Sequence, residues 1–330
     1  MHTVLANGVM NTEIYAFLRA VAQCTPGFRY ATMAAFCEAD WSWPRARGKM
    51  KLADLFSEVR ESSSLRDQSF KAGASETLSV YPVIRYFIEV AVAPTAKIPQ
   101  ERASFLSFCR VVDLMQAAKA GDARSLTQEL QHECSRSLRL HLAAYGPELV
   151  RPKHHYLQHL TKQASEDGFW LDCFVHERKH QIVKDAATHI KNTRSFEHSV
   201  LSTVLNATIE QMEKVVPSGL LPPTASHPDL SSAFGAPCRV SNQMRFGFVY
   251  IGVGDLLFLG RSACLVEACV AVGDDLQCIV CPLELLDRPS GSTSVWRRTE
   301  GMELLKPSWL MRHAACWTKR DDGCFVALGS

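Results

Sequence analysis

The sequence predicts an α+β protein that is predominantly α-helical over about residues 1–215 and β-rich at its carboxyl end. Apolar side chains recur at helical spacing through the first two thirds of the chain. After about residue 235 they fall instead into short runs separated by glycines, which is typical of strands and hairpins. Prolines gather between these parts. We therefore expect an all-α domain at 1–215, a proline-rich linker at 216–234 and a small barrel-like or bent-sheet domain at 235–330.

Composition narrows the class of protein. Hydrophobic residues make up 47% of the 330 residues, which excludes wholesale disorder. Lysine and arginine number 36 against 34 acidic residues, which gives a net charge of +2. This nearly neutral balance excludes a purely electrostatic nucleic-acid tail but permits a local basic patch. No uncharged apolar run is long enough to span a membrane, and the amino terminus has no signal-peptide pattern. We expect a nuclear or cytoplasmic protein that is not secreted, with reduced cysteines.

The first predicted helices lie before residue 56. Asn11 is a candidate N-cap residue, because apolar residues follow it along one helical face as far as Val21. A second helix, at about 30–37, ends before Pro44. The polar stretch from Ser57 to Ser75 predicts a loop.

Longer helices are predicted beyond this stretch. The run from Leu78 to Val92 is strongly apolar, and Pro82 predicts a first-turn position or a kink. Pro99 begins the next amphipathic helix. Further helices are predicted at about 126–142, 153–165, 174–190 and 196–212.

The β-rich part shows short apolar runs and regularly placed glycines. The predicted strands are 246–251, 255–259, 264–272 and 276–281. Large aromatic residues suited to the interior of a small barrel or bent sheet are Trp296, Trp309, Trp317 and Phe325.

Residues 176–180 spell H-E-x-x-H. On a helix His176 and His180 share a face and can bind Zn²⁺, while Glu177 activates the metal-bound water. The two interior residues are cations, which oppose a dication, and no third ligand is evident. A zinc-dependent hydrolase is therefore an alternative interpretation.

Two other groups of residues have the spacing of metal ligands. Cys278-x-x-Cys281 is compatible with a zinc site that includes Cys264 and Cys269, although cysteine in apolar strands is commonly a small hydrophobic residue. His155 and His159 form an i, i+4 pair that is suited either to a metal or to hydrogen bonding.

Residues 152–157 read Pro-Lys-His-His-Tyr-Leu, and Phe174 and Glu177-Arg178-Lys179-His180 follow. This segment resembles the one that follows the catalytic core in CACTA-type (En/Spm) transposases and in related mobile-element-derived proteins. A weaker resemblance extends upstream, over Met1-His2, Asn7-Gly8, 71–75 and 82–85.

The resemblance implies an RNase H-type nuclease in which acidic residues hold two Mg²⁺ ions. The first two acids are expected on strands upstream of Met1, and only Glu177 matches the position of a third. We therefore expect the carboxyl-terminal part of a transposase, which holds no cofactor and cleaves no DNA unless the upstream acids are supplied.

This interpretation predicts that the protein binds DNA. We also expect self-association, and we expect no association with a membrane. Cations beside Trp41 and Trp43 match the composition of single-strand binders, the alternative being a basic loop with its tryptophans in the helical core. One face of the helix predicted at 174–190 also carries cations that could contact phosphates. The alternative is that this face is simply exposed to solvent. The candidate nucleic-acid-binding residues are Arg45, Arg47, Lys49, Lys51, Lys153, His154, His155, Arg178, His180 and Lys184. A protein-interaction module and a non-functional remnant remain as alternatives.

Overall fold

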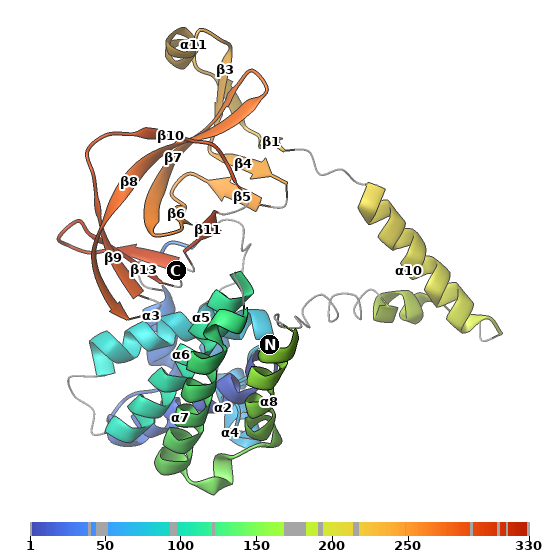
Figure 1. The fold of residues 1–330 in the computed structure, drawn as a ribbon, viewed down its shortest axis with the longest axis vertical. Helices are drawn as coiled ribbons and strands as arrows, with labels where there is room; N and C mark the ends of the chain where they lie inside the picture. The colour runs from blue at the N-terminus through green and yellow to red at the C-terminus, as the bar shows by residue number, and fades with distance from the viewer. Residues whose placement is uncertain are drawn as a thin grey trace.

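The computed structural model confirms the α+β fold: helices fill the amino-terminal two thirds, and a curled antiparallel sheet forms the carboxyl-terminal part (Figure 1). It describes residues 2–38, 41–43, 52–92, 98–120, 123–167, 183–190, 194–213, 218–247, 249–290, 293–308, 311–314 and 316–328. Within these ranges, none of the helices has the length and apolar character needed to cross a bilayer.

The helical body packs around one extensive hydrophobic core. Its α-helices are α1 (His2–Leu5), α2 (Val9–Cys24), α3 (Tyr30–Glu38), α4 (Glu58–Asp67), α5 (Ala74–Phe87), α6 (Pro99–Ala120), α7 (Thr127–Tyr145) and α8 (Pro152–Asp167). Shorter turns are the 3₁₀ segments η2 (Leu52–Phe56), η4 (Ala123–Leu126) and η5 (Pro147–Leu149) and the π-helical segment η3 (Ile88–Val92). α6 packs along α7 and against α2, where the rings of Phe17 and Phe105 lie 5.2 Å apart.

The start of α2 differs from the sequence prediction. Its N-cap residue is Gly8, and Asn11 occupies the third helical position, where its Oδ1 accepts a hydrogen bond from the Gly8 N–H at 3.1 Å. The Asn11 amide also donates to the carbonyl oxygens of Phe70 and Ala72 at 2.9 and 3.1 Å. A Cβ at Gly8 would lie 2.3 Å from the backbone carbon of Val4, so only glycine fits between α1 and α2.

The predicted loop at 57–75 is wrong, because α4 occupies much of it. This helix exposes most of its surface and buries only Ser64, so it has no apolar stripe for a sequence pattern to reveal. Glu58 and Glu61 in its first turn complement the helix dipole. The next helix, α5, begins at Ala74, so Pro82 lies in its interior and not in its first turn.

Beyond α8, residues 183–189 are helical and α10 spans Phe196–Glu213. Residues 174–182 of the helix predicted at 174–190 lie outside the described residues, and Ile190 follows the helical segment.

The carboxyl-terminal part consists of short antiparallel strands. They are β1 (Gly219–Leu220), β2 (Thr224–Ser226), β3 (Cys238–Ser241), β4 (Gln243–Phe246), β5 (Val249–Gly252), β6 (Leu256–Leu259), β7 (Ser262–Val272), β8 (Asp275–Ser290), β9 (Thr293–Arg298), β10 (Glu303–Leu305), β11 (Arg312–His313), β12 (Cys316–Lys319) and β13 (Phe325–Leu328). The main sheet has the order β11-β6-β7-β8-β9-β13-β12, while β1, β4 and β5 form a small second sheet.

Two predicted segments have a different structure here. The predicted strand 246–251 is divided between β4 and β5, because Gly247 has a φ of 57° and turns the chain. Within the range predicted as a linker, β1 pairs with β4, β2 pairs with β3, and α11 spans Pro228–Phe234. Of the predicted interior aromatic residues, Trp296, Trp317 and Phe325 pack together in the sheet, and Trp309 lies outside the described residues.

The sheet and the helical body meet in a common core. Buried side chains of β9, β12 and β13, among them Val295, Val326 and Leu328, belong to the same hydrophobic cluster as the helices. Backbone hydrogen bonds of 2.7 and 3.0 Å also join Ser42 to Trp317. The end of the sheet formed by β9, β13 and β12 therefore rests on the helical body near α3 and α5 (Figure 1).

Candidate functional site

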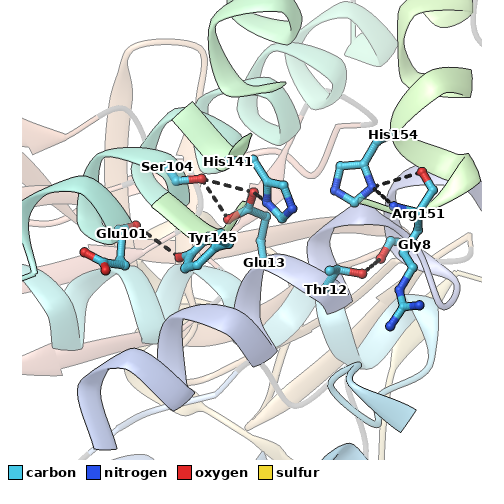
Figure 2. Close-up of polar contacts among 9 residues, drawn as sticks. All are labelled: Gly8, Thr12, Glu13, Glu101, Ser104, His141, Tyr145, Arg151 and His154. Atoms are coloured by element: carbon cyan, nitrogen blue, oxygen red, sulfur yellow. Dashed lines mark hydrogen bonds and ion pairs between the residues drawn. The ribbon is translucent and has the colours of Figure 1, made fainter. Parts of the chain in front are cut away.

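A buried polar network connects three helices of the body (Figure 2). Nδ1 of His141 on α7 lies 2.6 Å from Oε1 of Glu13 on α2, and the hydroxyl of Ser104 on α6 donates to both carboxylate oxygens at 3.2 Å. Glu13 and Ser104 are 0% exposed and His141 is 1% exposed. A carboxylate at this depth needs partners, and these two side chains supply them.

The arrangement differs from that of a serine nucleophile. In a Ser-His-acid triad the hydroxyl hydrogen-bonds to the imidazole, whereas Ser104 bonds to the carboxylate. The network also has no exposed surface through which a substrate could reach it. Its geometry suits positioning of α2, α6 and α7 rather than catalysis.

His154 of α8 extends this network. Its ring centroid lies 4.5 Å from that of His141, and its Nδ1 lies 2.9 Å from the backbone nitrogen of Arg151. Burial, followed by the nearby His141, lowers the pKa of His154 to about 4, so the imidazole is neutral at pH 7. The predicted role of His154 in nucleic-acid binding stays a prediction, and the structure shows this side chain 2% exposed and engaged inside the fold.

Lys153 also serves an internal contact. Its Nζ donates to the carbonyl oxygen of Ala6 at 2.6 Å, which ties α8 to the end of α1. Beside it, the guanidinium of Arg151 donates to Oε1 of Gln68 at 2.8 Å. Lys153 is half-buried, so its aliphatic chain and its charge are both engaged within the fold.

His155 and Lys184 are the predicted nucleic-acid-binding residues that the structure places on the surface. His155 lies one helical turn from the exposed His159, and their Nε2 atoms are 3.1 Å apart. The other predicted site residues lie outside the described residues: Arg45, Arg47, Lys49, Lys51, His176, Glu177, Arg178 and His180. The hypothesis of a zinc site at H-E-x-x-H therefore stays a prediction.

The two tryptophans before the basic run pack against the helical core. Nε1 of Trp41 donates to the carbonyl oxygen of Phe36 at 3.1 Å, and its ring meets that of Tyr86 edge-on at 5.5 Å. Trp43 also packs against this core. Since both indoles are half-buried, the structure favours the interpretation that places the tryptophans in the helical core over that of base-stacking side chains.

The cysteines of the sheet do not converge on a metal site. Cys278 lies in a core cluster with Cys264 and Cys269, but Cys281, three residues further along β8, contacts the carbonyl oxygens of Pro282 and Thr299. An odd separation along a strand places side chains on opposite faces. Burial also raises the pKa of Cys264 to about 12, which favours the thiol over the metal-binding thiolate. Across the described ranges, no three His, Cys, Asp or Glu side chains are grouped so that they could hold a metal ion.

Sequence analysis missed Glu13 and His141. A usable signal was present: Glu13 lies among Ile14, Phe17 and other apolar residues of α2, a helix that is buried on nearly every side. An acidic residue in such a helix requires a polar partner elsewhere in the chain. The identity of that partner was not predictable, because His141 lies 128 residues away.

No protein-family model, no curated protein and no solved structure matches this chain.

Proposed function

We propose that this chain is a transposase-derived protein that binds DNA, with the helical body as the scaffold for its contacts. The observation that supports the proposal is that segments resembling CACTA-type transposases lie close together in the fold. Three such segments, near residues 2–8, 71–75 and 152–157, lie far apart in the sequence, but the first of them packs against the helices that carry or follow the other two.

Each of these segments supplies a specific contact. Lys153 of the Pro-Lys-His-His-Tyr-Leu segment bonds to Ala6 beside Asn7-Gly8. Asn11, whose side chain caps the Gly8 N–H, bonds to the carbonyl oxygen of Ala72 in the second segment. These contacts bring the resembling segments together at one end of the helical body, as expected of a scaffold that a family shares.

The proposed DNA contacts combine exposed residues with the basic run. His155 and Lys184 are exposed, and the four cations of 45–51 follow in sequence after Trp43, which packs against the helical core. Cations of this kind contact phosphates without reading the base sequence. DNA binding of this kind implies a nuclear location.

A salt-dependent DNA titration tests the proposal. The logarithm of the association constant should fall linearly with the logarithm of salt concentration, because each phosphate contact releases condensed counterions. Replacing Arg45, Arg47, Lys49 and Lys51 by alanine should lower the magnitude of that slope by about 3 to 4 on duplex DNA, at about 0.9 per contact. Fluorescence anisotropy of a labelled duplex at several salt concentrations measures both slopes.

A charge-matched variant provides the control. Replacing the exposed cations Arg19, Arg66, Arg288 and Lys306 by alanine changes the net charge equally at positions spread over the surface. The slope should then stay near that of the unmodified chain. Equal losses in the two variants, or no binding at low salt, would contradict the proposal and favour a protein-interaction module.

A further inference from the structure

The exposed surface of α8 carries two imidazoles that point toward each other. His155 and His159 are one helical turn apart, their ring planes are inclined at 82°, and their Nε2 atoms lie 3.1 Å apart. One Nε2 must donate a proton and the other accept it for this contact to be a hydrogen bond. A metal ion that takes the place of the shared proton would make both Nε2 atoms its ligands, as neutral imidazoles are.

The backbone that carries this pair is held from the opposite side of the helix. The buried face of α8 consists of His154, Leu157, Thr161 and Ala164. Lys153 ties the first turn to Ala6, and the His154 ring packs on His141. Both histidines also lie within a helix that continues to Asp167, so their spacing is set before any ligand binds.

We propose that His155 and His159 bind a divalent late transition-metal ion, Cu²⁺ or Ni²⁺, as two neighbouring ligands. With metal–nitrogen distances of about 2.1 Å, a separation of 3.1 Å between the nitrogens corresponds to an angle of about 95° at the metal. Neighbouring ligands in the tetragonal sites of Cu²⁺ and Ni²⁺ subtend angles near this value. A tetrahedral Zn²⁺ ion needs nitrogens about 3.4 Å apart, so it fits the observed pair less well.

The charges near this pair do not oppose a cation strongly. Arg151, one turn before His155, is directed to Gln68 at 2.8 Å. Lys162, three residues after His159, lies 3.7 Å from the carboxylate of Glu166. Two protein ligands leave further coordination positions open to water, consistent with the exposure of the pair.

Calorimetric titration of NiCl₂ into the full chain, prepared without a histidine tag, tests this site. His155→Ala and His159→Ala should each weaken Ni²⁺ binding by about 100-fold, because the second ligand no longer binds intramolecularly. The matched variant exchanges His159→Gln and Gln163→His. This variant keeps the number of histidines but separates the pair by eight residues, about 12 Å along the helix axis. Its Ni²⁺ binding should be weakened as much as in the two alanine variants.

Two further variants distinguish this pair from other histidines. The double variant His176→Ala with His180→Ala removes the H-E-x-x-H residues, and His132→Ala removes a single exposed histidine of α7. Both should bind Ni²⁺ as the unmodified chain does. Unchanged binding in His155→Ala, or retention of binding in the exchange variant, would overturn the proposal. Loss of binding in the H-E-x-x-H variant would also overturn it, by placing the metal there.

Discussion

At the scale of single residues, the body of this protein accommodates the buried side chains of Glu13 and His154 in two different ways. Glu13 is paired with Ser104 and His141, while His154 stays uncharged beside His141. The lowered pKa of His154 has a consequence for stability. Unfolding exposes this imidazole to water, so the unfolded state binds its proton more readily than the folded state does.

We expect acid to destabilise the fold through His154. The stability that the neutral ring permits is fully present above pH 6.5. It is lost as the pH falls toward 4, and at pH 4 the loss reaches about 3 kcal/mol. Replacing His154 by glutamine should remove this part of the pH dependence, since glutamine cannot be protonated. Urea unfolding between pH 7 and pH 4 in the presence of a chelator measures the difference between the two proteins. A glutamine at the exposed His132 of α7 is the control and should leave the effect of His154 in place.

At the scale of elements, sequence patterns predicted those helices that have one apolar face. α8 was expected at 153–165 and spans Pro152–Asp167, because its buried residues recur at helical spacing. α4 was missed, because a helix with one buried residue has no such pattern. The contact partners of Lys153 and His154 could not be predicted from the sequence either. Ala6 and His141 are distant in sequence, and only the packing of α8 against α1 and α7 brings them close.

A charged hydrogen bond in its first turn contributes to the docking of α8. Replacing Lys153 by methionine keeps the aliphatic chain but removes the donor to the Ala6 carbonyl oxygen. Because a hydrogen bond to a charged group contributes more than a neutral one, we expect a loss of about 1.5 to 3 kcal/mol in the free energy of unfolding. Chemical denaturation measures the loss, and hydrogen exchange should show faster opening of α8. Methionine at Lys162, an exposed position on the same helix, should change neither quantity.

At the scale of the whole molecule, the two halves of the fold share a core that the sequence did not reveal. Hydrophobic periodicity separates a helical part from a β-rich part, but it does not show which strand faces which helix. The structure places Val295, Val326 and Leu328 in the cluster that also contains Phe17 and Phe105. A sheet that completes the core of a helical body should unfold together with it.

Replacing the fully buried Leu328 by alanine tests this coupling, because the residue belongs to the sheet but packs in the shared cluster. The expected loss is about 2 to 5 kcal/mol, as is usual when a buried leucine is truncated. Helical circular dichroism and tryptophan fluorescence should report one transition, moved to lower denaturant by the same amount. Alanine at Met302, an exposed residue of the β-rich part, should leave that transition in place. Should the helical signal keep its original midpoint while the fluorescence midpoint falls, the two parts would instead be independent domains, and the shared core would contribute little to the stability of either.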